Sequence, residues 1–344
     1  MDGVEIGLER LVEAGLPGAF VYVEDADGAS RFYTAGYADV ESGRLMTPGT
    51  HYRIGSTTKT FTAVVTMQLV REGKLALGDS MRAVLPDMSI PNGEALTVEH
   101  LLRMRSGLFD FEDDPSLLGD LEAHLRPTTL QHAVDMGIRQ PAMFAPGEKF
   151  AYCNTNFCVL EMVIERVTGR SLAAEFEERI FGPLGLVNTS YPDEYDLSLP
   201  EPYVRGYERT EVGWRECSEV FFGRGDGAII STAIDVGRFF RALLVEGRLL
   251  TPEMLGRMMS VVEDEPPAEM AYGLGLIADE MPCGTVWGHS GGGLGYGHAP
   301  YLRLETGRFA IFMRNASLGF RLATDPELAE RLRFSPEFRA GVYC

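Results

Sequence analysis

The sequence predicts an α/β fold of the α+β type, in which one antiparallel sheet flanked by helices is built from both chain ends. Short apolar runs rich in β-branched and aromatic residues occur near both termini, and mostly helical patterns lie between them. The strands are expected at residues 19–24, 31–37, 285–289, 299–304 and 308–314. Such a distribution is typical of a single sheet that is interrupted by an all-helical insertion.

The same distribution predicts the domain organisation. Residues 1–60 and 225–344 would form the α/β sheet domain, and residues 61–224 would form a mostly helical domain. Clefts occur preferentially where domains meet, so we expect the active site at this junction.

Local start and stop signals predict the helices. Residues 3–15 have an amphipathic pattern that ends at Gly15, and residues 25–28 form the turn between the first two strands. A helix runs over about residues 56–72, and Gly73 is its stop signal. Further helices are expected at residues 156–168, 171–180, 234–246, 252–260 and 325–334.

Composition and charge exclude several classes of protein. The 344 residues include 31 basic and 50 acidic side chains, and the formal net charge of −19 argues against nucleic-acid binding and against docking on anionic membranes. Apolar residues make up 45% of the chain, which allows a large core, and no run of 18 apolar residues suggests a membrane span. No signal peptide is visible, so we expect a cytoplasmic protein, or a secreted one whose signal was removed.

The cysteines do not indicate a metal site. None of the five forms a C-x-x-C pair, and no cluster of cysteine and histidine has zinc-ligand spacing. The simplest interpretation is reduced, mostly buried thiols. We expect no metal and no other cofactor.

The first segment that suggests chemistry is Ser56-Thr57-Thr58-Lys59, at the start of a helix. Residues three apart on a helix share a face, so the hydroxyl and the amine would lie side by side. A desolvated lysine amine can take the proton of a serine hydroxyl and make it a nucleophile. The free backbone N–H of Ser56 in the first turn could also stabilise an oxyanion.

Two further segments could complete such a site. Tyr152-Cys153-Asn154 offers a phenol whose pKa a nearby lysine would lower, and an amide that could hold a substrate carbonyl. Residues 288–293 read Gly-His-Ser-Gly-Gly-Gly and end a predicted strand, where glycines allow a substrate to approach backbone N–H groups. The second segment also matches the G-x-S-x-G nucleophile elbow, but no helix follows the serine, so we reject that interpretation.

In order and spacing, Ser56-x-x-Lys59, Tyr152-x-Asn154 and His289-Ser290-Gly291 resemble the three motifs of the serine β-lactamase and penicillin-binding protein superfamily, class C branch. The likeness covers nearly the whole chain and extends to residues 52–55, 71–75, 105–108, 146–147, 154–157 and 272–275. It is closest to soluble D-alanyl-D-alanine carboxypeptidases, and class C-like esterases, D-aminopeptidases and acyltransferases are also similar. The resemblance implies a β-lactamase/transpeptidase-like fold and a serine acyl-enzyme.

The resemblance also implies a role for each motif residue. Ser56 would be the nucleophile, Lys59 its base partner and Tyr152 a proton relay that His289 assists. The N–H groups of Ser56 and Gly292 would form the oxyanion hole. The substrate-binding residues would be Asn154, Ser290, Gly291, Gly292, Arg224 and Phe222. Cys283 and Cys344 fall where some secreted carboxypeptidases of this family carry a disulfide, which is the alternative to reduced thiols.

Departures from the family pattern bear on the substrate. In the carboxypeptidases an arginine and two hydroxyls hold the terminal carboxylate, whereas this sequence has Ile277 in place of the arginine and Gly292 in place of one hydroxyl. Because a free carboxylate binds best to a guanidinium group, we expect a substrate that lacks one, unless Arg224 substitutes from the opposite wall.

The sequence therefore predicts a serine acyl-enzyme hydrolase or acyltransferase that acts on a small ester, amide or peptide. The substrate partner is a small molecule or peptide, and an amine or alcohol is an alternative acyl acceptor to water. The competing hypotheses are a D-alanyl-D-alanine carboxypeptidase, a class C-like β-lactamase and a non-catalytic penicillin-binding-like sensor, the last disfavoured by the intact catalytic groups.

Overall fold

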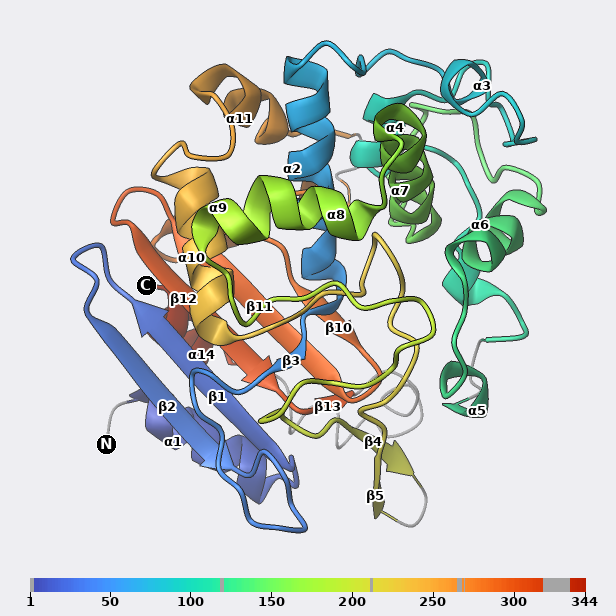
Figure 1. Cartoon of the computed structure of the whole chain (residues 1–344). Coiled ribbons are helices and arrows are strands. Elements are labelled where there is room, and N and C mark those ends of the chain that lie inside the picture. The colour runs from blue at the N-terminus through green and yellow to red at the C-terminus, as the bar shows by residue number, and fades with distance from the viewer. Residues whose placement is uncertain (1–2, 118–120, 211–212, 265–267, 269, 318–334) are drawn as a thin grey trace.

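The computed structural model describes residues 3–117, 121–210, 213–264, 268, 270–317 and 335–344. Within these residues a large sheet lies at one side of the molecule, and most of the helices gather against one of its faces and beyond its edge (Figure 1). This α+β arrangement is the one the sequence predicts.

The large sheet takes strands from both chain ends. The strand order is β2-β1-β12-β11-β9-β8-β7, β10 pairs with β11, and all these pairings are antiparallel. The bounds are β1 Gly18–Glu24, β2 Ser30–Gly36, β7 Ala271–Tyr272, β8 Ile277–Met281, β9 Gly284–Gly288, β10 Gly291–Gly293, β11 Tyr296–Arg303 and β12 Arg308–Arg314. The five predicted strands are confirmed as β1, β2, β9, β11 and β12.

Helices cover both faces of this sheet. On one face lie α1 (Gly3–Glu13) and α14 (Pro336–Tyr343), and on the other lies α10 (Ala233–Leu244) (Figure 1). Strand β12 packs against the helices on both faces of the sheet. Phe309 contacts α10 at Gly237, and Phe312 packs edge-on against Phe338 of α14. Alternate sides of one strand thus support two separate helix layers.

The remaining helices belong mostly to the middle of the chain. They are α2 Thr58–Arg71, α3 Met81–Val84, α4 Val98–Leu102, α5 Leu121–His124, α6 Leu130–Ile138, α7 Thr155–Thr168, α8 Leu172–Phe176, α9 Gly182–Leu184 and α11 Pro252–Met258. Every residue of α2 from Thr58 to Leu69 is buried, so this helix runs through the interior. No helix in the described ranges combines the length and apolar character needed to span a bilayer.

Some elements differ from the prediction. The helix expected at 171–180 is divided, because α8 continues as a π-helical turn at Glu177–Phe181. The predicted helix at 325–334 lies outside the described residues. Several short strands were not predicted because none has a long alternating pattern: β3 Tyr52–Arg53, β4 Tyr207–Thr210, β5 Gly213–Glu216, β6 Ile230–Ser231, β7, β8, β10 and β13 Ala316–Ser317.

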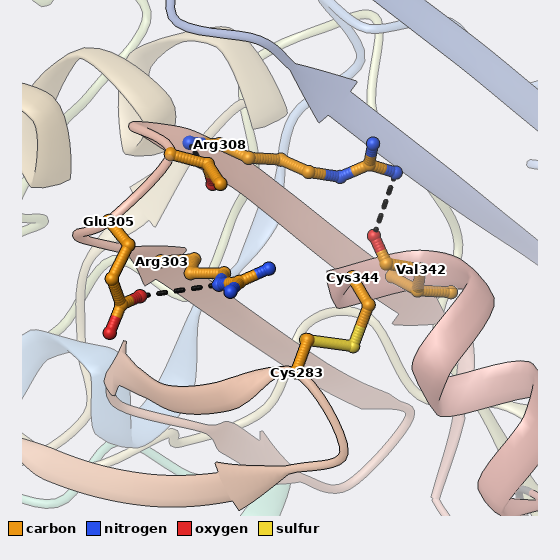
Figure 2. The surroundings of a disulfide bond; sticks show 7 residues. Cys283, Arg303, Glu305, Arg308, Val342 and Cys344 are labelled. Atoms are coloured by element: carbon orange, nitrogen blue, oxygen red, sulfur yellow. Dashed lines mark hydrogen bonds and ion pairs between the residues drawn. A yellow bond between two sulfur atoms is a disulfide. The ribbon is translucent and has the colours of Figure 1, made fainter.

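A disulfide joins Cys283 to Cys344, which is the alternative that the family resemblance raised (Figure 2). Cys283 lies in the turn between β8 and β9, and Cys344 follows α14. The bond therefore fastens the C-terminal helix to the large sheet, where Arg308 also donates a hydrogen bond of 3.3 Å to the carbonyl of Val342. The other three cysteines are free and buried: Cys153, Cys158 and Cys217.

Replacing both Cys283 and Cys344 by serine should lower the free energy of unfolding. The bond joins residues separated by 61 positions, and crosslinks of this kind typically contribute about 2–4 kcal/mol. Urea unfolding with and without reductant measures the difference. Reductant should destabilise the natural protein and leave the double variant unchanged; equal stability of the two oxidised proteins would contradict the prediction.

Candidate active site

Ser56 lies in a 3-10 turn, η1 (Gly55–Thr57), that leads directly into α2. Gly55 has a φ of +49°, and a Cβ added to it would lie 2.8 Å from the backbone nitrogen of Gly292. Glycine is therefore required for this close approach. It brings the turn that carries Ser56 against β10, and both Ser56 and Gly292 line one cavity.

Lys59 follows one helical turn later and is completely buried. Its Nζ lies 2.9 Å from the Oγ of Ser56, 2.6 Å from the Oδ1 of Asn154 and 2.9 Å from the carbonyl oxygen of Asp226. An ammonium group has three N–H donors, and each of them has an acceptor here. The predicted contact between Lys59 and Ser56 is thus present in the structure.

The resting charges of Lys59 and Tyr152 differ from what the sequence suggested. Burial lowers the pKa of Lys59, but the neighbouring Tyr152 and Asp226 outweigh burial and hold this pKa above its ordinary value. For Tyr152, burial raises the pKa above its ordinary value despite the positive charge of Lys59 and hydrogen bonding to Ser56 and Lys59. We therefore assign an ammonium and a neutral phenol to the resting site, whereas the sequence suggested a lowered phenol pKa.

The geometry around Lys59 also accommodates the neutral amine. The carbonyl oxygens of Asn154 and Asp226 only accept hydrogen bonds, so they would keep the two N–H groups of an amine. The lone pair would then point at Ser56, which could donate its hydroxyl proton to it. When Lys59 loses one proton, it no longer donates a hydrogen bond to Ser56 and can instead act as a base toward the serine hydroxyl. The side chain does not have to move for this change.

Asn154 is held by a residue that the sequence analysis missed. Asp110 accepts hydrogen bonds from both the backbone N–H and the side-chain amide of Asn154, each at 3.0 Å. Because the amide nitrogen is committed to this carboxylate, the Oδ1 of Asn154 must face Lys59. Asp110 lies 44 positions before Asn154 in a loop without pattern, so the sequence offered no signal for it.

His289 occupies a buried position beside the phenols of Tyr152 and Tyr272. Its Nδ1 lies 2.7 Å from the carbonyl of Ser290, which only accepts, so this nitrogen carries the hydrogen. The unprotonated Nε2 then accepts from the hydroxyl of Tyr272 at 2.9 Å. Burial and the charge of Lys59 lower the pKa of His289 to about 3, which keeps the ring neutral.

The contacts of His289 do not support its expected part in the proton relay. Its only free lone pair is engaged by Tyr272, and its ring centroid lies 6.3 Å from that of Tyr152. Tyr272 belongs to the segment 272–275, which resembles the family, but the resemblance assigned this tyrosine no role.

Two predicted substrate contacts lie outside the cleft. The hydroxyl of Ser290 interacts with Tyr301, and both residues line a cavity beside α14, on the opposite face of the sheet from α10. The guanidinium of Arg224 stacks at 4.7 Å on the ring of Tyr191 and lies 3.7 Å from Glu161, beside another cavity. Neither residue is retained as a carboxylate-binding group.

The cleft over Ser56 has a volume of about 330 Å³. Its described lining residues are Gly55, Ser56, Glu112, Asp113, His124, Phe221, Phe222, Asp226, Gly227, Gly292, Gly293, Leu294 and Ser317. Phe222 and Gly292 are thus where the prediction places them. Gly291 lies just behind the cavity, where a Cβ would come within 2.0 Å of the carbonyl of Ile54.

The ionisable residues that line this cleft are mostly acidic. Its described lining residues include no arginine or lysine, while the carboxyl groups of Glu112 and Asp113 belong to its wall. Desolvation by the surrounding protein, together with the carboxylates of Asp110 and Asp226, raises the pKa of Glu112 to about 8, so this carboxyl group is largely protonated at neutral pH until a positive charge lies beside it. A positively charged group placed beside Glu112 would relieve this repulsion.

A family model described as Beta-lactamase matches residues 8–332. The chain belongs to this Beta-lactamase family. Curated relatives include a D-aminopeptidase of Gluconobacter oxydans, 29% identical over 84% of this chain and 55% of the relative, and penicillin-binding protein 4* of Bacillus subtilis, 26% identical over 84% and 66%. As a Beta-lactamase family member with these relatives, the protein is an enzyme of the serine hydrolase type.

Solved structures of amide-cleaving enzymes have the same fold. A D-stereospecific amidohydrolase from a Streptomyces species is 33% identical with a TM-score of 0.82, and the match covers 91% of this chain and 93% of that one. A D-amino acid amidase from Ochrobactrum anthropi SV3 is 26% identical with a TM-score of 0.81, over 96% of both chains.

The pKa values of the buried pair predict the pH dependence of acylation. One proton must leave the pair formed by Lys59 and Tyr152 before Ser56 can be deprotonated, and both pKa values are raised. We therefore expect kcat/KM for a neutral p-nitrophenyl ester to keep rising with pH through the neutral and alkaline range. Stopped-flow or steady-state assays measure this profile, with Ser56→Ala as the control for hydroxide-catalysed hydrolysis. A flat profile above pH 6 would contradict the assigned resting charges.

Proposed function

We propose that this protein is a serine amidohydrolase for small amides that carry a free amino group and lack a free carboxylate next to the scissile bond. The observation that carries the proposal is the acidic lining of the cleft, where the carboxyl groups of Glu112 and Asp113 belong to the wall and no described lining residue is a lysine or an arginine. A substrate ammonium group would be attracted to this wall, and a substrate carboxylate would be repelled by it.

Catalysis would follow an acyl-enzyme route. The Oγ of Ser56 attacks the amide carbon and passes its proton to the neutral amine of Lys59, with the phenol of Tyr152 close enough to exchange protons with both. The N–H groups of Ser56 and Gly292 would stabilise the oxyanion of the tetrahedral intermediate. The leaving amine then takes the proton, and water releases the acyl group through the same steps.

The rest of the cleft suits an amino acid side chain. Phe221, Phe222 and Leu294 form an apolar part of the wall, so an aromatic or large aliphatic side chain would be desolvated there. The structural neighbours named as D-stereospecific amidohydrolase and D-amino acid amidase make an amide of a D-amino acid the first substrate to test. Transfer of the acyl group to an amine or alcohol instead of water would use the same intermediate.

A D-alanyl-D-alanine carboxypeptidase is the second candidate. Penicillin-binding proteins among the relatives favour it. The terminal carboxylate of such a substrate would, however, find neither Arg224, which faces another cavity, nor a charged His289, because that ring is neutral. We therefore rank this activity below amide hydrolysis.

A substrate panel tests the two candidates. D-phenylalanine amide should be hydrolysed with kcat/KM at least about tenfold above that of N-acetyl-D-phenylalanine amide and of an N-acylated D-alanyl-D-alanine peptide, since a 1.4 kcal/mol difference corresponds to tenfold. Mass spectrometry of the products separates hydrolysis from acyl transfer. Faster turnover of the D-alanyl-D-alanine peptide would overturn the proposed substrate class.

The nucleophile is tested in the same experiment. A fluorophosphonate probe should add its mass to the natural protein and not to Ser56→Ala. Persistent labelling of this variant would remove Ser56 from the mechanism, whatever the substrate panel gives.

Glu112 provides a sharper test of amine recognition. Glu112→Gln should raise KM for D-phenylalanine amide by about tenfold, the effect of roughly 1.4 kcal/mol in binding, and leave KM for the N-acetyl analogue unchanged. Glu94→Gln, which changes an exposed carboxylate outside the cleft, is the matched control. Equal effects of Glu112→Gln on both substrates would show that the carboxylate does not bind the amine.

The disulfide bears on the compartment in which the chain folds. We infer folding in an oxidising compartment, because disulfides between cysteines such as Cys283 and Cys344 persist there and are rare in the cytoplasm. This proposal favours the secreted alternative over the cytoplasmic location expected from the N-terminal sequence.

A further inference from the structure

His298 makes contacts at the back of the catalytic turn that the mechanism above does not use. It lies on β11 directly opposite Gly291 of β10 in the antiparallel register. A Cβ added to Gly291 would lie 2.0 Å from the carbonyl oxygen of Ile54 and 3.0 Å from the Nε2 of His298. Only the absence of a side chain at Gly291 lets the imidazole reach across β10 to the turn that carries Ser56.

The imidazole contacts residues on both sides of Ser56. Its Nε2 lies 2.8 Å from the carbonyl oxygen of Ile54 and 2.7 Å from the Oγ1 of Thr57. The hydroxyl of Thr57 donates at 2.6 Å to the carbonyl oxygen of His289, in the third motif. One buried side chain is therefore linked to the residues around the nucleophile and, through Thr57, to the strand segment that leads into Gly292.

The partners of His298 determine its tautomer. The carbonyl of Ile54 only accepts, and the proton of Thr57 is committed to the carbonyl of His289, so the Nε2 of His298 must carry the hydrogen. The Nδ1 then accepts from the hydroxyl of Tyr52 at 3.3 Å. Every polar atom of this neutral ring has a partner, and burial lowers its pKa to about 3.

The two N–H groups assigned to the oxyanion hole lie on different segments, Ser56 on the 3-10 turn and Gly292 on β10. Their separation depends on how firmly the turn is fastened to β10 and β11. We propose that His298 is a positioning residue that, together with Thr57, sets this separation and so supports transition-state stabilisation. The proposal rests on the proposed roles of Ser56 and Gly292.

Thr57→Val is the decisive variant, because it keeps the shape of the side chain and removes the hydroxyl between His298 and His289. For a p-nitrophenyl ester, kcat per titrated active site should fall by about 10- to 100-fold, since displacements near 1 Å can cost about 100-fold, while KM should change by less than about threefold. His298→Ala should behave similarly, and His298→Gln, which retains a donor, should recover at least part of the loss.

Controls separate positioning from general destabilisation. Thr66→Val removes a buried hydroxyl within α2, which donates to the carbonyl oxygen of Thr62, and should leave kcat unchanged. Active sites are counted by fluorophosphonate labelling, and melting temperatures are measured for all variants. Because His298 is neutral, its variants should keep the shape of the natural protein's pH profile, with lower rates at every pH.

The outcomes distinguish the proposals. If the natural protein is not labelled at Ser56, the proposed function fails and the positioning role fails with it. If Ser56 is labelled and Thr57→Val lowers only the melting temperature, with kcat per site unchanged, the positioning role alone is overturned. A shift of the pH profile in His298→Gln would also overturn it, because that result would require His298 to exchange a proton during the reaction.

Discussion

The charge of Lys59, buried at the start of an interior helix, is the constraint on which the active site depends. Removing an ammonium group from water costs several kcal/mol unless its donors are all satisfied. Here the three acceptors come from three separate segments: Ser56 in the turn before α2, Asn154 before α7 and Asp226 in the loop before β6. The group proposed to activate the serine therefore also joins the sheet and the helices at one point.

Each acceptor of Lys59 is in turn held by buried polar groups. Asp110 orients Asn154, and the loop that carries Asp226 is fixed because Glu161 and Thr62 bond to the N–H and the carbonyl of Gly225. These contacts leave little freedom for the acceptor oxygens. The lysine can lose or regain its proton while the surrounding atoms stay in place, which is the condition for electrostatic preorganisation in a site of this kind.

Sequence reasoning reached the parts of this arrangement that are local. Ser56 and Lys59 are one helical turn apart, and the strands β1, β2, β9, β11 and β12 have clear patterns, so both could be predicted. Asp110 and His298 act on residues 44 and 241 positions away, and no pattern in one sequence connects such pairs.

Ser290 and Arg224 were predicted to line the cleft but lie outside it, because of contacts that form only in the folded chain. Ser290 lies between β9 and β10 and lines the cavity beside α14, whereas His289, one residue earlier, is buried beside Tyr152 and Tyr272. Arg224 is drawn away by Tyr191 and Glu161, contacts that only the folded chain reveals.

The absence of a guanidinium group from the described lining of the cleft follows from the same packing. The resemblance placed an arginine at position 277 and a carboxylate contact at the third motif, but Ile277 is a buried residue of β8 paired with Gly288. His289 could contribute positive charge only if its ring were protonated, and both burial and the charge of Lys59 oppose protonation. Among the described lysine and arginine side chains, a carboxylate in the cleft would therefore find Lys59 beside Ser56, and binding to it would disrupt the three contacts that keep the lysine aligned with Ser56. In the proposed function, selection against a carboxylate and activation of the serine would thus both be consequences of a single buried charge.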